Sequence, residues 1–466
     1  MAKTRSCFSA YHPRMSESAA SRPPSAVPFR EALLYWLKLG FISFGGPAGQ
    51  IAVMHQELVE RRRWISERRF LHALNYCMLL PGPEAQQLAT YIGWLMHGTR
   101  GGIAAGVLFV LPSLALLIAL SWIYMLWGDT PLVAGILYGI KPAVTAVVLF
   151  AAWRIGSRVL RNTALWAISA AAFIAIHFLA VPFPAIILAA AAIGFAGARI
   201  APQKFTTGAG HALTGKSHGP ALIDDGTPTP AHAQFRLPGL FLVCAIGLLL
   251  WTASLGAIAL MQGWDGTLTR MGWFFTKAAL LTFGGAYAVL PYVVQGAVQQ
   301  FQWLTPVQMI DGLALGETTP GPLIMVVAFV GFVGAWTHSV FGPDSPVLAG
   351  VAGAMAATWF TFLPSFIFIF AGAPVIETTH RQPALTAPLT AITAAVVGVI
   401  LNLAVFFALH VFWPEGLQAS TDWASVVIAA AAAIALFRHK AGIIPVIAAC
   451  GVAGVAIHAV RILGSG

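Results

Sequence analysis

The amino-acid sequence predicts an all-α polytopic membrane protein of two homologous, inverted halves that contain discontinuous or re-entrant helices. One observation is composition: the 466-residue chain is 58% hydrophobic and only 9% charged, whereas soluble proteins carry about 25% charged residues. Apolar runs at residues 103–127 and 237–261 exceed the roughly 20 residues that cross a bilayer. A large water-soluble domain is therefore excluded.

The other observation is an internal repeat. Two segments match without a gap at an offset of 239 residues, so that Lys38 falls on Lys277. The same offset superimposes FGG at 44–46 on 283–285, and PGP at 81–83 on 320–322. After a short insertion, LPS at 111–113 falls on 363–365. Duplicated halves are a common construction of secondary transporters.

Composition also divides the chain into five parts. Residues 1–28 form a polar tail without the apolar segment of a signal peptide, and we expect it to be cytoplasmic and disordered. The N-terminal transporter half follows at 29–200. Residues 201–236, rich in Gly, Thr, Pro and His, predict a flexible cytoplasmic linker. A connecting transmembrane helix at 237–262 and the C-terminal half at 270–466 complete the chain.

Each half opens with two apolar stretches broken by Gly and Pro. Unpaired backbone at membrane depth survives only where protein or a water-filled cavity covers it. The breaks therefore predict re-entrant hairpins or discontinuous helices, with continuous kinked helices as the alternative. The broken stretches are 33–54, 70–96, 274–294 and 309–336. Full spans are expected at 103–127, 132–153, 164–181, 183–198, 237–261, 347–370, 385–412, 423–437 and 443–462.

The distribution of basic residues predicts the orientation. With a cytoplasmic N-terminus and re-entrant breaks, the basic loops, including Arg61–Arg69 and Arg154–Arg161, all face the cytoplasm. Only Arg270 and Arg461 lie outside. An odd number of spans then places the C-terminus in the periplasm. The loop at 299–308, which matches the basic loop at 61–69, carries no charge, and this favours inverted over parallel halves.

Several classes of partner are not indicated. The four cysteines form no CxxC pair, so we expect no metal site and no disulfide framework. The net charge of +10 lies in loops beside the lipid bilayer and does not indicate nucleic acid. Residues 210–217 match GxxxxGK[ST], but the strand and helix of a phosphate loop are missing from their surroundings. We therefore expect no cofactor.

Three motifs resemble the chromate ion transporter family in its long, two-domain form. They are FGGPAGQI at 44–51, PGPEAQQLATYIGW at 81–94 and GETTPGP at 316–322. The resemblance implies a bacterial inner-membrane protein that exports chromate and confers chromate resistance, with some relatives linked to sulfate. One departure is Ala286, which stands where the first half has Pro47, so the halves need not contribute equally. A homodimer is left open.

The helix breaks are the predicted site for a tetrahedral dianion. Helix N-termini offer free N–H groups with a partial positive charge, and glycine permits close backbone approach. Lys38 and Lys277 are either countercharges for the anion or interfacial anchors. Glu84 and Glu317 are candidates for carrying a proton. The candidate substrate-binding residues are Lys38, Gly45, Gly46, Pro81, Gly82, Pro83, Gln86, Lys277, Gly284, Gly285, Thr318, Thr319, Pro320, Gly321 and Pro322.

Together these features predict a secondary transporter, and not an enzyme, that exports chromate. The membrane potential would drive the dianion outward, and exchange for inward protons would add to this drive. One alternative is uptake or exchange of sulfate or another oxyanion. A membrane-bound chromate reductase is a further alternative, but it would require a redox cofactor whose binding motifs the sequence lacks. A channel is also left open.

Overall fold

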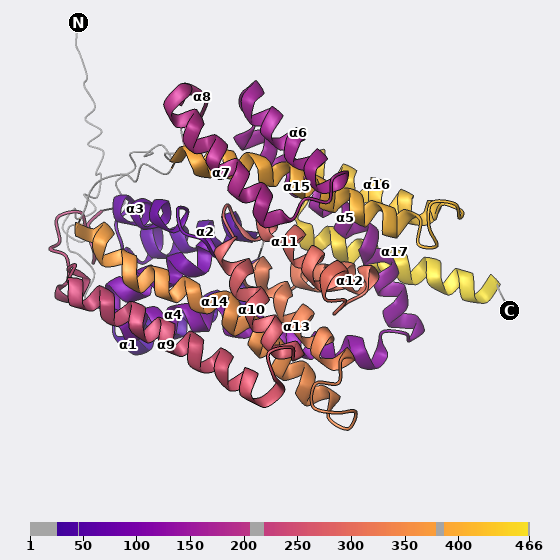
Figure 1. Cartoon of the computed structure of the whole chain (residues 1–466), viewed down its shortest axis with the longest axis horizontal. Helices are drawn as coiled ribbons and strands as arrows, with labels where there is room; N and C mark the ends of the chain where they lie inside the picture. Colours follow the sequence, from indigo (N-terminus) through magenta and orange to yellow (C-terminus); the bar gives the residue numbers. More distant parts are fainter. Residues whose placement is uncertain (1–25, 45, 206–218, 379–385, 465–466) are drawn as a thin grey trace, which may run out of the picture.

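The protein is a bundle of helices, many of which run along its long axis (Figure 1). The structure is a computed structural model that describes residues 26–44, 46–205, 219–378 and 386–464, and every regular element within them is a helix. The predicted tail up to residue 25, Gly45 and the motif at 210–217 lie outside these ranges. Seven described helices are long and apolar enough to cross a membrane: Glu84–Trp127, Pro131–Val159, Phe183–Ile200, Leu237–Gln262, Pro346–Glu377, Ala387–Phe412 and Ile443–Leu463.

Each broken stretch contains two helical segments separated by its Gly- and Pro-containing break. The first half contains α1 (Phe29–Ile42), α2 (Gly46–His55), η1 (Gln56–Arg61), α3 (Glu67–Cys77) and α4 (Glu84–Trp127). The second half contains α10 (Thr267–Leu280), α11 (Ala286–Val294), η3 (Gln295–Gln300), α12 (Pro306–Thr318), η4 (Leu323–Met325), α13 (Val326–Thr337) and α14 (Pro346–Thr378). The repeat extends to backbone detail, because η1 and η3 are both π-helical and Arg63 and its equivalent Gln302 both have positive φ.

The broken stretches are discontinuous, because separate helices meet at each break. A helix of 14 residues, such as α1 or α10, is only about 21 Å long, which is less than the roughly 30 Å of a bilayer core. The initial segment of α4 also turns back, because the backbone of His97 and Gly98 is not helical. Gly93 and Gly101 then face each other across this bend. The alternative of continuous kinked helices is therefore not the fold.

The two halves are inverted. Equivalent helices α4 and α14 run antiparallel, since Gly102 faces Phe370 and Gly106 faces Phe366. A helix and its repeat can run in opposite directions only if one half is turned over relative to the other. The connecting helix α9 (Leu237–Gln262), which lies between the halves in sequence, packs along α14 (Figure 1).

The remaining helices interlock the halves. They are α5 (Pro131–Val159), α6 (Thr163–His177) and α7 (Phe183–Ile200), with α15 (Thr386–Phe412), α16 (Trp423–Phe437) and α17 (Ile443–Gly464). Both α16 and α17 pack on α5 of the other half, and α6 and α7 pack on α15. Small residues such as Gly139, beside Cys450, permit this close packing. Helices α6 and α16 are about 22 Å long, shorter than a straight crossing.

The described part of the linker, residues 219–236, packs against the first half. Leu222 and Ile223 donate backbone hydrogen bonds to the carbonyls of Arg63 and Trp64, at 2.9 and 3.1 Å. Ile223 and Ala233 are buried. Because the linker is rich in Gly, Pro and Thr, its composition alone does not indicate that these apolar residues pack against the first half.

Candidate functional site

The helix breaks of the two halves meet through a pair of equivalent hydrogen bonds. The Gly82 N–H donates to the Thr282 carbonyl, and the Gly321 N–H donates to the Ser43 carbonyl, both at 2.7 Å. Ser43 and Thr282 occupy equivalent positions immediately before the two FGG motifs. Each PGP break therefore contacts the FGG break of the other half, and all four breaks converge.

The PGP turns also pack against the LPS motif of the opposite half. Gly82 and Gly321 have φ values of +130° and +103°, a backbone region that only glycine adopts readily. Gly82 faces the Ser365 side chain, while a Cβ at Gly321 would lie 2.7 Å from that of Ser113. Because their N–H groups already bind carbonyls, these two glycines do not offer them to an anion.

The FGG breaks place two helix starts next to each other. Helix α2 begins at Gly46, with φ +73°, and Gly285 precedes α11, with φ +97°. A Cβ at Gly285 would lie 3.7 Å from the ring of Pro47, while Gly284 faces Thr393. No side chain caps the N-terminus of α11, whereas Thr305 caps α12, which begins at a loop. Such helix starts carry free N–H groups and partial positive charge.

Arg154, a residue that the sequence assigned to a cytoplasmic loop, lies beside the first FGG break. Helix α5 extends to Val159, beyond the predicted end of the span at residue 153, so Arg154 is a half-buried helical residue. Its Nη2 atom lies 3.9 Å from the position of a Cβ at Gly46. Within the described ranges, its side chain forms no direct hydrogen bond or ion pair.

Glu317 lies within electrostatic range of this arginine. It stands near the end of α12 and accepts a hydrogen bond from the Tyr287 hydroxyl of α11. Arg154 interacts electrostatically with both Glu317 and Tyr287, although it is not within ion-pair distance of the carboxylate. The neighbouring hydroxyls of Thr318 and Thr319 donate to carbonyls of their own helix. Pro320 and Pro322 flank the glycine of the same turn.

The other acidic candidate has different surroundings. Glu84 is the first residue of α4, directly after Pro83, and it is half-buried. No described residue hydrogen-bonds to its carboxylate. Gln86 is buried and donates to the Thr90 hydroxyl at 3.1 Å. In the same turn, Gln87 donates to the Pro81 carbonyl at 2.8 Å and so braces the break.

The two repeated lysines lie away from these contacts. Lys38 is exposed on α1 and has no ion-pair partner among the described residues. Lys277 is half-buried, and its Nζ lies 6.0 Å from the ring centroid of Trp273, an exposed residue one turn earlier on α10. The countercharge role of both lysines stays a prediction.

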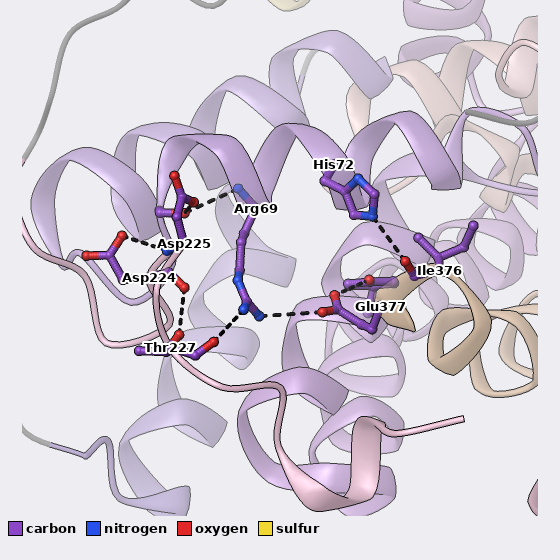
Figure 2. Close-up of polar contacts among 9 residues, drawn as sticks. Arg69, His72, Asp224, Asp225, Thr227, Ile376 and Glu377 are labelled. Carbon is purple, nitrogen blue, oxygen red and sulfur yellow. Dashed lines mark hydrogen bonds and ion pairs between the residues drawn. The ribbon is translucent and has the colours of Figure 1, made fainter. Parts of the chain in front are cut away.

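Two clusters of buried and half-buried polar residues contain none of the candidate substrate-binding residues. Lys141 pairs with Asp311 at 3.5 Å, and the Tyr124 hydroxyl donates to the same carboxylate. In the second cluster, Arg69 of α3 pairs with Glu377 of α14 at 3.4 Å and donates to the Thr227 carbonyl of the linker at 2.7 Å. Figure 2 shows this arginine extending between the linker and the end of α14.

Broken helices that converge inside interlocked inverted repeats are the architecture of secondary transporters. The family model described as chromate transporter matches residues 30–195 and 269–455, and the chain belongs to that family. These matches agree with the resemblance noted from the FGG and PGP motifs. The protein is thus a multi-pass membrane transporter with a role in chromate transport.

Individual relatives support this assignment. A chromate transport protein of Pseudomonas aeruginosa is 32% identical over 95% of this chain and 96% of its own length. A chromate transport protein of Cupriavidus metallidurans is 28% identical over 81% of this chain and 82% of its own. A probable chromate transport protein of Synechococcus elongatus is 28% identical over 82% and 84%, respectively. No solved structure matches the chain.

Proposed function

We propose that this protein exports chromate from the cytoplasm, and thereby confers chromate resistance, by binding the dianion where the four helix breaks converge. The observation that supports this proposal is the pair of crossed hydrogen bonds from Gly82 and Gly321. They bring the discontinuous backbone of both halves to one place. Alternating access in inverted repeats takes place around such a shared site.

The chemistry of the breaks suits a tetrahedral oxyanion. The starts of α2 and α11 direct N–H groups to a region where Pro47 and Gly285 adjoin. Neutral donors bind a dianion without a matching set of buried countercharges, which are costly inside a membrane. Because sulfate has the same shape and charge, we expect it to compete with chromate.

The proposed orientation places the N-terminus in the cytoplasm and the C-terminus in the periplasm of a bacterial inner membrane. Arg270 and Arg461, the basic residues on the periplasmic side, are each paired with an acid, at 2.8 Å from Asp265 and 3.0 Å from Asp422. Burial opposes ionisation of Asp422, but hydrogen bonds from Tyr138, Ser425 and Arg461 outweigh it and hold the pKa below its ordinary value. These pairs reduce the conflict with the positive-inside rule.

Reporter fusions test the orientation. Alkaline phosphatase fused after Gly466 should be active, because the enzyme folds in the periplasm. The same reporter fused after Lys216, in the linker, should be inactive. Blotting of both fusions controls for expression, and activity at Lys216 would overturn the proposed orientation.

Transport measurements test the drive. Moving two negative charges out of a negative interior is favourable by about 4.6 kcal/mol per 100 mV, from about 2.3 per charge, which supports roughly a thousandfold gradient. Inverted membrane vesicles with a positive interior should therefore accumulate labelled chromate, saturably and with inhibition by sulfate. Vesicles without the protein are the control. Failure of an imposed voltage to drive uptake would contradict voltage-driven export.

A further inference from the structure

We propose that Arg154 binds the oxyanion and that the Glu317 carboxylate competes with the anion for it, so that one proton accompanies each dianion. This inference rests on the proposed function, because it concerns the same site. It deepens that function by naming the binding residue and the coupling.

Arg154 is the charged group best placed for an anion at the first FGG break. Its guanidinium lies 3.9 Å from the Cβ position at Gly46, the first residue of α2, and 6.0 Å from the ring centroid of Phe150 on its own helix. A half-buried charge loses part of its solvation, and an opposite charge normally compensates for that loss. Since no described residue forms an ion pair with this side chain, the guanidinium is available to an anionic ligand.

Glu317 is the acid that interacts electrostatically with Arg154. The Tyr287 hydroxyl of α11 donates a hydrogen bond to this carboxylate, and the Arg154 charge of α5 acts on it at longer range. Three other charged residues lie on α5 and α12: Lys141 and Asp311, which pair with each other at 3.5 Å, and Arg158, which is exposed. The charge balance at the break therefore depends on Arg154 and Glu317.

This balance couples anion binding to protonation. When Glu317 is ionised, it offsets the arginine, and an incoming dianion meets the repulsion of a carboxylate in a medium of low dielectric constant. When Glu317 is protonated, the Arg154 charge is uncompensated and attracts the anion. The proton comes from cytoplasmic water, resides on the Glu317 carboxyl group, and leaves to the periplasm with the dianion. This coupling is opposite in sense to the proton exchange predicted from the sequence.

The repeat contains the Arg154–Glu317 pair only once, so this pair accounts for one proton. The offset of Ser113 and Ser365 places Phe406 at the position equivalent to Arg154. The offset of 239 residues places Met78 at the position equivalent to Glu317. The repeat-equivalent positions therefore carry no second copy of this pair, and a cycle that moves one dianion with the Glu317 proton moves a net charge of −1.

Zero-flux voltages in proteoliposomes test the coupling, at an alkaline pH where chromate is a dianion. For the parent, with one net charge, the voltage should shift by about 59 mV per tenfold chromate gradient and equally per tenfold proton gradient. In the Glu317→Gln variant, each cycle would move two negative charges and no proton. The zero-flux voltage should then shift by about 30 mV per tenfold chromate gradient and should not depend on the proton gradient. Glu317→Asp should retain the parent behaviour. A parent value near 20 mV would instead indicate exchange with one proton and overturn the inference.

Variants of the arginine test the binding role. Arg154→Gln should reduce chromate flux per folded molecule by about 100-fold, in the range expected for loss of a buried charge contact. Arg154→Lys should be intermediate, because it keeps the charge and loses the planar fork. Arg158→Gln, an exposed site one turn further on α5, is the matched control and should transport normally. Size-exclusion profiles in detergent establish folding.

The outcomes separate the two proposals. Absence of chromate flux in the parent would contradict the proposed export function itself. Normal flux in the parent together with normal flux in Arg154→Gln, or a 59 mV response in Glu317→Gln, would overturn only the Arg154–Glu317 inference. Loss of transport in Lys38→Ala or Lys277→Ala, with Arg154→Gln active, would assign the countercharge to the lysine.

Discussion

Replacing Gly82 or Gly321 by valine should abolish chromate transport and destabilise the assembly of the two halves. Both glycines have left-handed φ values, which cost a side-chain-bearing residue roughly 1–2 kcal/mol. A Cβ at Gly82 would also lie 2.5 Å from Nε2 of Gln87, and one at Gly321 would lie 2.7 Å from Cβ of Ser113. Overpacking of this kind costs roughly 1–3 kcal/mol more.

Protein level in the membrane, thermal stability in detergent and chromate flux should be measured together for these variants. Gly256→Val is the matched control, because a Cβ at Gly256 on α9 meets nothing within 4 Å. This control should be folded and active. Parental flux and stability in both Gly82→Val and Gly321→Val would show that the crossed turns do not hold the halves together.

Lys141→Ala should destabilise the protein by about 3–5 kcal/mol, because it leaves a buried carboxylate without its cation. Asp311 is only 2% exposed, and its remaining partner is the Tyr124 hydroxyl at 3.1 Å. Adding Asp311→Asn to Lys141→Ala removes the unpaired charge and should recover part of the loss. The midpoint of thermal unfolding in detergent measures both effects.

An exposed ion pair on the same predicted side provides the comparison. Arg270 and Asp265 are 2.8 Å apart but largely solvent-exposed, so Arg270→Ala should cost less than about 1 kcal/mol. If Lys141→Ala were no more destabilising than Arg270→Ala, the Lys141–Asp311 pair would have no role in holding α5 against α12.

Much of the fold could be predicted from two features of the sequence, the internal repeat and the Gly- and Pro-containing breaks. The 239-residue offset keeps every break in register, so two inverted copies must present equivalent breaks to each other. Gly and Pro at 45–47 and 81–83 interrupt apolar runs that are otherwise long enough to span. Length and charge distribution then predict re-entrant hairpins of opposite orientation.

The features that the sequence did not reveal depend on tertiary contacts. The sequence from Trp153 to Val159 predicts a basic loop. In the structure this segment continues helix α5 and contains Arg154, and its Gly156 packs beside Val397 of α15. The sequence predicts that the Gly82 and Gly321 N–H groups are available to an anion. In the structure they donate to carbonyls of the opposite half. Such partners lie 200 or more residues away in sequence, where local patterns carry no information.

Amide hydrogen exchange of the purified protein, with and without chromate, tests most directly whether the anion binds at the helix breaks. Chromate should slow exchange at the starts of both α2 (Gly46–His55) and α11 (Ala286–Val294), because the bound anion would accept hydrogen bonds there. Exchange in the linker at residues 219–236 should not change. Protection confined to the linker or the surface loops, with α2 and α11 unaffected, would contradict binding at the breaks.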